Sequence, residues 1–193
     1  YTTQLFQRGT AMGKIQTVIA DPPWNQTGGG KIKRGADRHY KLMKTGECIE
    51  TVGEMLEQHD LGDNLHFYLW VTNNQVPDGL RLFDELGFIY KTNVAWIKDR
   101  FGIGYYFRGQ HELILFGVRG NGARVKTTDN GVASVITAKR RKHSQKPREF
   151  YDVVERRSEG EYLYLFSRQQ PRDGWHMVGD EVGKLSDDEN WLF

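Results

Sequence analysis

The chain has 193 residues, with 27 Lys and Arg, 25 Asp and Glu and a formal net charge of +2. This length and composition predict one globular domain over 1–193, with 1–13 as a flexible N-terminal extension. The single cysteine excludes an intrachain disulfide and favours a reducing compartment, the six histidines lack the spacing of a metal site, and we expect neither a membrane span nor a signal peptide.

Hydrophobic periodicity and turn residues predict alternating strands and helices. In chain order these are a strand over 15–20, a helix over 45–59, a strand over 65–71, a helix over 77–87, strands over 88–97, 113–118 and 132–137, a helix over 147–157 and a strand over 162–166. Thr45 is the expected cap of the first helix, and Pro77 and Pro147 are expected at the start of the other two. Beyond Gly174 we expect irregular structure with one further strand.

This alternation predicts an α/β fold with a mostly parallel sheet and helices on both faces. In open sheets of this kind, ligands bind at the carboxyl ends of the strands. The turn at Asp21 and the pair Ser167-Arg168 each follow a predicted strand, so we expect both at such an end. A nicotinamide-dependent dehydrogenase is disfavoured, because 102–104 and 120–122 lack the third glycine of the dinucleotide-binding pattern.

The middle of the chain is strongly basic. Between Lys98 and Arg148 there are 12 Lys and Arg against 3 acids, whereas Asp173 to Glu189 holds six acids against one Lys. Such asymmetry indicates a positive face that could hold phosphates, and a solvated loop is the alternative. Lys98, Arg100, Arg108 and the run at 139–142 are the candidate phosphate contacts.

The tetrapeptide Asp21-Pro22-Pro23-Trp24 suits a reaction at an aromatic amine. The lone pair of such an amine is delocalised, so an enzyme must hold both N–H groups while the nitrogen becomes tetrahedral. Asp21 offers a carboxylate acceptor and Pro22 a carbonyl acceptor, which Pro23 stiffens by restricting the backbone. Trp24 offers a flat face on which a base can stack. The alternative interpretation is a tight turn with a partly buried aromatic.

This tetrapeptide after a strand resembles the hallmark of the MT-A70 family of S-adenosylmethionine-dependent N6-adenine methyltransferases, and the resemblance extends from about Lys14 to Gly183. Further segments resemble the family in the same order: His39-Tyr40 with Met43, Leu69 to Asn73, Trp96 to Lys98, Gly104 to Arg108 with His111-Glu112, Ser144 to Pro147 with Glu149 and Tyr151, Leu165 to Arg168, Gly174-Trp175 and Gly179 to Glu181. The resemblance implies a Rossmann-like class I methyltransferase fold with a permuted motif order, in which the catalytic motif precedes the cofactor region.

The resemblance also implies roles for individual residues. Asp21 would contact both the target amine and the amino group of the cofactor, S-adenosyl-L-methionine, Pro22 would accept from the amine, and Trp24 would shape the pocket. The implied contacts to substrate are Tyr40, Glu112, Ser144 and Lys146, and those to the cofactor are Lys146, Arg168, Asp180 and Glu181. Asp180 departs from the family, which has Asn there, although a carboxylate can still accept from ribose hydroxyls.

Two further pairs of aromatic residues have expected positions. Tyr105 and Tyr106 either stack on an unpaired base or pack on the sheet. Trp70 and Trp96 lie within apolar strands, so we expect them in the core.

We therefore expect an adenine-N6 methyltransferase acting on nucleic acid, with DNA favoured over RNA by the compact length. The alternatives are an RNA N6-adenosine methyltransferase, a catalytically silent nucleic-acid-binding subunit and a generic α/β binding domain. A homodimer or a related subunit is the expected protein partner. The expected location is the cytoplasm of a prokaryotic or phage-infected cell, or the nucleus in a eukaryote.

Overall fold

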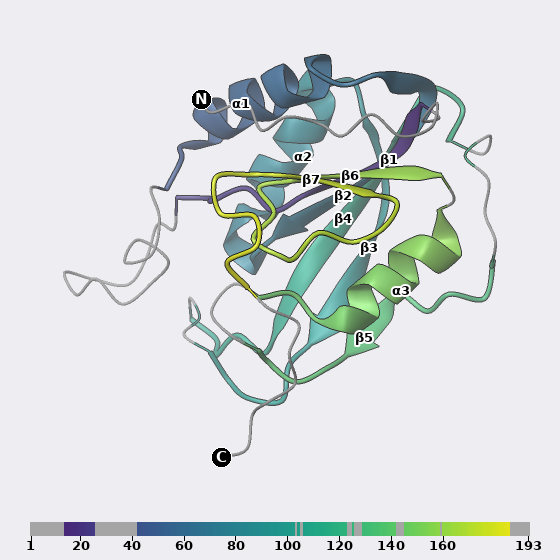
Figure 1. The fold of residues 1–193 in the computed structure, drawn as a ribbon. Coiled ribbons are helices and arrows are strands. Elements are labelled where there is room, and N and C mark those ends of the chain that lie inside the picture. The colour runs from purple at the N-terminus through teal and green to yellow at the C-terminus, as the bar shows by residue number, and fades with distance from the viewer. Residues whose placement is uncertain are drawn as a thin grey trace.

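The computed structural model describes residues 14–25, 42–102, 104, 106–122, 125, 129–141, 145–158 and 160–185. Within them, seven strands form one sheet in the order β5-β3-β4-β2-β1-β6-β7 (Figure 1). The strands are β1 Ile15–Ala20, β2 Leu61–Val71, β3 Ile89–Ile97, β4 His111–Arg119, β5 Val135–Thr137, β6 Glu161–Leu165 and β7 Trp175–Val178. The helices are α1 Thr45–Glu57, α2 Val76–Glu85 and α3 Arg148–Arg157, with a short 3-10 helix, η2, over Asn73–Gln75.

The direction of the strands brings distant parts of the chain to one edge of the sheet. β1 pairs in parallel with β2 on one side and with β6 on the other, whereas β4 is antiparallel to both of its neighbours. The carboxyl ends of β1, β3, β6 and β7 therefore lie at the same edge as the start of β4. The chain continues from β1 through α1 to β2 on one side, whereas β6 on the other side follows α3, so the strand order reverses at β1, and open α/β sheets bind ligands at the carboxyl end of such a point.

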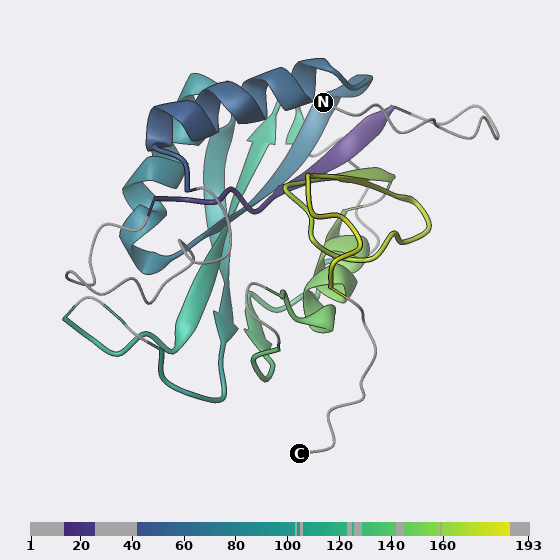
Figure 2. The ribbon, with the colours of Figure 1, turned by 60° about the vertical axis from the view of Figure 1, so that its left-hand side comes forward.

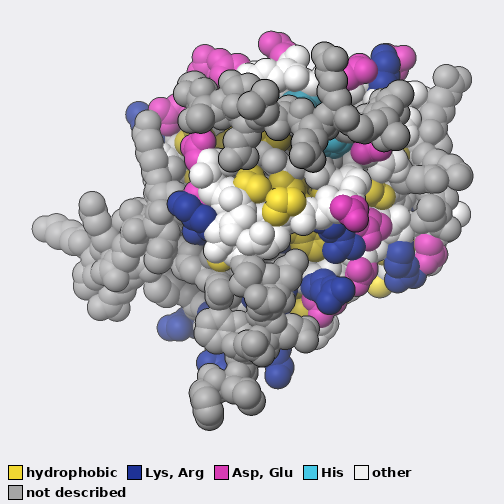
Figure 3. All heavy atoms as spheres, viewed as in Figure 1, with side chains coloured by type: hydrophobic (Ala, Val, Ile, Leu, Met, Phe, Trp, Pro, Cys, Tyr) yellow, Lys and Arg dark blue, Asp and Glu magenta, His cyan; other side chains and the backbone are white. Residues whose placement is uncertain are grey.

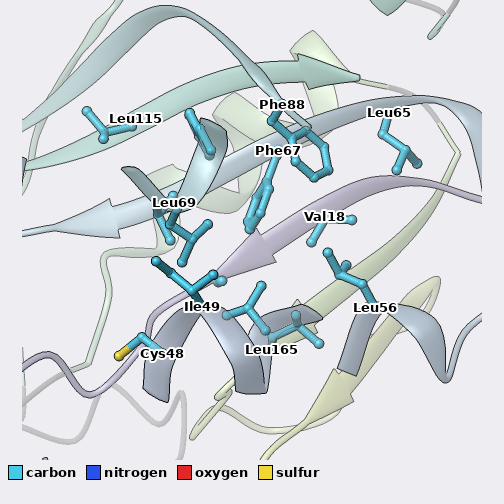
Figure 4. Packing of buried hydrophobic residues seen from close by; sticks show 14 of the residues in the cluster. Val18, Cys48, Ile49, Leu56, Leu65, Phe67, Leu69, Phe88, Leu115 and Leu165 are labelled. Carbon is cyan, nitrogen blue, oxygen red and sulfur yellow. The ribbon is translucent and has the colours of Figure 1, made fainter. Parts of the chain in front are cut away.

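Helices α1 and α2 cover one face of the sheet, and α3 lies against the other (Figures 1 and 2). Under α1 and α2, side chains of the central strands interdigitate with the apolar sides of the helices (Figure 4). Val18, Phe67 and Leu165 are fully buried there, and each such side chain contributes about 1.5–3 kcal/mol to folding. This packing fixes the strand ends that carry the polar residues described below.

The second face has an aromatic core. Trp70 of β2 packs edge-on against Trp96 of β3 and Phe150 of α3, with ring centroids 6.1 and 4.8 Å apart. Tyr151 packs against Trp175 of β7. The expectation that Trp70 and Trp96 lie in the core is confirmed, since both are buried.

The predicted α/β fold, with its mostly parallel sheet and helices on both faces, is confirmed, and three local expectations are wrong. β2 begins at Leu61 rather than at residue 65, because Leu61 pairs with Ile15 at the start of β1. β5 keeps only the last three residues of the predicted 132–137 strand, since it pairs with β3 only at 95–97. Thr45 is the first helical residue rather than the cap, and its hydroxyl donates to Asp78 Oδ1 of α2 at 2.8 Å.

No helix among the described residues combines the length and apolar character that crossing a bilayer requires.

Candidate active site

Four charged side chains meet at the carboxyl edge of the sheet. Asp21 follows β1, Lys98 follows β3, Glu112 is the second residue of β4, and Lys146 precedes α3. Lys146 Nζ lies 3.0 Å from Asp21 Oδ1 and 3.3 Å from Glu112 Oε2. Lys98 Nζ lies 2.5 Å from Glu112 Oε1. The result is one continuous row of alternating charge that joins four segments of the chain.

The rings of two tryptophans lie against the lysines of this row. Lys146 Nζ lies 4.5 Å from the centroid of the Trp70 ring, and Lys98 Nζ lies 4.7 Å from that of Trp96. An ammonium over an indole face is stabilised by about 0.5–2 kcal/mol. Sequence reasoning placed both tryptophans in the core and missed this contact. The feature of the sequence that could have indicated this contact is the position of each tryptophan near the end of an apolar strand.

Burial and the neighbouring lysines shift the pKa values of the two carboxylates in opposite directions. Burial raises the pKa of Asp21 above its ordinary value, because Lys146 offsets only part of the desolvation and Glu112 adds repulsion. Burial alone would raise the pKa of Glu112 too, but Lys146 and Lys98 flank it and lower the pKa to about 2. Glu112 is therefore a permanent anion that anchors both lysines, whereas Asp21 is the carboxylate with the greater affinity for a proton.

The turn that carries Asp21 is fixed by the backbone. Asp21 N donates to Leu165 O of β6 at 3.3 Å, and Trp24 N donates to Pro22 O at 2.8 Å. The Pro23 carbonyl accepts from Met43 N at 2.8 Å. A carbonyl oxygen has two lone pairs, so Pro22 retains one for a further donor. The side chain of Asp21 is 20% exposed at the rim of this turn.

Trp24 differs from the expected open stacking face. Its indole is 6% exposed and belongs to the hydrophobic core under α1. Its Nε1 donates to Trp70 O at 2.9 Å, which ties the turn after β1 to the last residues of β2. The buried ring leaves too little surface for a base to stack on. Trp24 instead holds the turn in place through its hydrogen bond and its packing.

A second group of charges follows β6 and β7. Arg168 Nε lies 2.5 Å from Glu181 Oε2, and Lys184 Nζ lies 2.5 Å from Glu181 Oε1. These contacts, first of all the bond from Lys184, hold the pKa of Glu181 below its ordinary value. Asp180 is exposed beside them. A Cβ at Gly179 would lie 2.8 Å from the Ser167 carbonyl oxygen, so the two strand ends approach each other closely.

The remaining predicted residues fall into two groups. Tyr40, Tyr105 and Ser144 lie outside the described residues. Arg108 is exposed in the loop between β3 and β4, where its Nε donates to Gly102 O at 3.0 Å. Of the residues expected to contact substrate, the structure therefore brings together Lys98, Glu112 and Lys146.

A cavity of about 520 Å³ lies at the opposite edge of the sheet, lined among others by His66, Tyr68 and Phe116. Ser158 Oγ lies 2.6 Å from His66 Nδ1 and 2.7 Å from Tyr68 OH, and His66 Nε2 lies 2.8 Å from Gly122 O. Since a carbonyl only accepts, His66 Nε2 carries the proton, Ser158 donates to His66 Nδ1 and Tyr68 donates to Ser158. These groups satisfy one another, which is typical of a structural network.

Comparison with known proteins gives one matching family, whose model, described as MT-A70, covers residues 15–181. The N(6)-adenosine-methyltransferase catalytic subunit METTL3 of Homo sapiens is 28% identical over 182 residues, which span 89% of this chain and 29% of METTL3. The METTL3 subunit of Danio rerio is 29% identical over 192 residues, 89% of this chain and 30% of its own length. The type II methyltransferase M.MunI of Mycoplasma sp is 27% identical over 187 residues, 88% of this chain and 78% of M.MunI. The chain thus spans less than a third of the METTL3 proteins.

Proposed function

The chain belongs to the MT-A70 family of methyltransferases, and from this premise we propose that it methylates the exocyclic N6 amine of adenine in a nucleic acid. The observation that carries the proposal is the contact of Asp21 with Lys146 at the carboxyl end of β1, 3.0 Å between Oδ1 and Nζ. This contact fixes the Asp21 carboxylate, which can accept an N–H group, at the carboxyl end of β1 before any substrate arrives. Acceptors fixed in advance need no reorganisation during the reaction.

The chemistry at the target amine needs two acceptors. The Asp21 carboxylate accepts one N–H, and the remaining lone pair of the Pro22 carbonyl accepts the other. Both hydrogen bonds favour a tetrahedral nitrogen, whose lone pair is then free to react. After methyl transfer the nitrogen loses one proton, and Asp21 is a suitable acceptor because burial raises its pKa.

S-adenosylmethionine, the methyl donor typical of the family, supplies an activated methyl group on a sulfonium when it is bound. Residues beyond β6 and β7, together with Lys146 before α3, fit this group by their chemistry. Arg168 and Lys146 are cations suited to a carboxylate, and Asp180 and Glu181 can accept from ribose hydroxyls. Glu181 is already held by Arg168 at 2.5 Å, so it is oriented before binding. Arg168 also acts electrostatically on the Asp21 carboxylate, so we place the cofactor next to the acceptor of the target amine.

DNA is the proposed substrate and RNA the alternative. The names of the relatives point to both substrates. METTL3 is named for adenosine, the ribonucleoside, whereas M.MunI, matched over 78% of its length, is a type II methyltransferase. A methyl-transfer assay on matched single- and double-stranded DNA and RNA, followed by mass spectrometry of the nucleosides, tests the proposal. It predicts N6-methylated deoxyadenosine as the main product. N6-methylated adenosine from RNA alone would replace DNA with RNA, and methylated cytosine would refute the chemistry.

A silent subunit is the competing function, and cofactor binding separates the two. We expect the wild-type chain to bind S-adenosylmethionine in a calorimetric titration, and Arg168→Ala to weaken that binding at least 10-fold. Arg156→Ala is the matched control, because Arg156 is an exposed arginine paired with Asp129 away from the site. A wild-type chain that does not bind the cofactor would favour the silent subunit.

A further inference from the structure

The loop between β3 and β4 is ordered by several internal hydrogen bonds. Lys98 N donates to Gln110 O at 2.8 Å, and Gln110 Nε2 returns a bond to Lys98 O at 3.1 Å. Further out, Gly102 N donates to Gly109 O at 2.6 Å, and Arg108 crosses to the Gly102 carbonyl. The Lys98–Gln110 pair continues the antiparallel ladder of β3 and β4 by one step, and the other bonds close the teal loop, which extends from the sheet at the lower left of Figure 2.

The tip of this loop is folded tightly. A Cβ at Gly104 would lie 1.8 Å from the Phe107 carbonyl oxygen and 2.6 Å from Gly109 N, so only glycine fits there. Tyr106 has a φ of 62°, a left-handed conformation that is uncommon for a tyrosine and persists where its surroundings impose it. The backbone of the tip thus directs the neighbouring side chains outward.

Among the described residues of this loop, three aromatic side chains face solvent. Tyr106 is 92% exposed, Phe107 85% and Phe101 63%. Scattered exposed apolar residues are ordinary, but three large aromatics in one tightly folded loop indicate a binding surface. We call Phe101, Tyr106 and Phe107 the aromatic tip.

Positive charge surrounds the aromatic tip. Arg100 and Arg108 belong to the same loop and are exposed. Asp99 Oδ1 accepts from Arg140 N at 2.9 Å, which fastens the basic segment 139–141 to the base of the loop. In Figure 3, Lys and Arg side chains lie along the lower edge of the molecule, where Figure 1 places the loops that follow β3 and β5. Aromatic faces framed by cations suit a polyanion with exposed bases.

We propose that the aromatic tip binds unpaired nucleotides next to the target adenine, by stacking their bases on Phe101, Tyr106 and Phe107 while Arg100 and Arg108 contact the phosphates. This inference rests on the proposed function and names its substrate class as nucleic acid with unpaired bases. The loop starts at Lys98 and ends just before Glu112, both part of the charged row. Phe107 precedes Glu112 by five residues, which limits their separation to about 18 Å. The tip is therefore close enough to the charged row to contact nucleotides that flank the reacting base.

Binding of labelled 20-nucleotide single strands, measured by fluorescence anisotropy at fixed low salt, tests this inference directly. The wild type should bind the single-stranded DNA or RNA at least 10-fold more tightly than the fully paired duplex of the same sequence. The double variant Tyr106→Ala/Phe107→Ala should lose about 10-fold or more in affinity for the single strand, as expected for two stacked bases. The salt dependence of binding should be unchanged, because no charge is removed. Ile89→Ala is the control, since Ile89 is an exposed apolar residue at the far end of β3, and it should bind like the wild type.

A second variant gives a positive signal. Tyr106→Trp should retain binding, and its new indole fluorescence should be quenched when the single strand is added. The inference is overturned if the double variant binds normally, if the duplex binds as tightly as the single strand, or if the double variant instead changes the oligomeric state seen by light scattering. The last result would assign the tip to a protein interface. Binding needs no methyl transfer, so an inactive wild type that still shows these affinities would refute the proposed function while leaving the aromatic tip intact.

Discussion

Lys146 lies between two carboxylates, and the structure distinguishes them. Glu112 also contacts Lys98, and its pKa is lowered to about 2, whereas the pKa of Asp21 is raised by burial. Two carboxyl groups within reach of one ammonium therefore have different tasks. Glu112 keeps the lysines in place, and we propose Asp21 as the carboxylate that contacts a substrate.

Replacing Glu112 tests the anchoring role at the residue scale. Glu112→Gln should lower the free energy of unfolding by about 1–3 kcal/mol, because it removes the shared counterion of two lysines that are largely buried. Urea denaturation at pH 7 measures this loss. Glu85→Gln, which breaks the exposed pair with Arg81, is the matched control and should cost less than about 1 kcal/mol. Equal losses in the two variants would show that Glu112 is not an anchor.

At the scale of elements, the sequence predicted types well and boundaries less well. Apolar runs such as 65–71 and the turn at Asp21 are local signals, so they predict β1 and β2. The extension of β2 to Leu61 and the shortness of β5 depend on pairing with β1 and β3, which no local pattern contains. The same limit holds in the site: the resemblance to a family supplied Asp21, Glu112 and Lys146, but their joining in one row is a property of the folded sheet.

Two helical glycines give opposite predictions. Gly79 of α2 packs so closely on the sheet that a Cβ would lie 2.8 Å from side-chain atoms of Leu115 and Val71. Gly79→Ala should therefore destabilise the protein by about 1–3 kcal/mol through overpacking. A Cβ at Gly46, in the first turn of α1, would meet nothing within 4 Å, so Gly46→Ala should stabilise by up to about 1 kcal/mol. Thermal unfolding of both variants checks the pair, and shifts of the same sign would contradict the packing of α2.

At the scale of the whole molecule, the two edges of the sheet differ in purpose. At the carboxyl edge, Asp21, Lys146, Glu112 and Lys98 form ion pairs that share partners. The opposite edge holds the network of His66, Ser158 and Tyr68, whose donors and acceptors are matched. Burial lowers the pKa of His66 to about 4, so the network requires a neutral ring.

This requirement predicts an acid-labile fold. In the unfolded chain His66 has an ordinary pKa near 6.5, so below that pH the unfolded state binds a proton that the folded state rejects. The free energy of unfolding should therefore fall as the pH drops from about 6.5 to 4, by up to about 3 kcal/mol for a shift of this size. Denaturation curves at several pH values measure the slope. His66→Asn, which keeps an acceptor for Ser158, should be less stable at pH 7 but lose much of that pH dependence, and an unchanged slope would argue against the His66 network.

The central claim is that the Asp21 carboxylate holds the amine that is methylated. The most direct measurement is the single-turnover rate of N6 methylation by Asp21→Asn, with nucleic-acid binding measured alongside. Asn keeps the shape of the side chain but removes its charge, so we expect the rate to fall by about 100-fold or more while the nucleic acid still binds. A variant that methylates adenine at the wild-type rate would contradict the account.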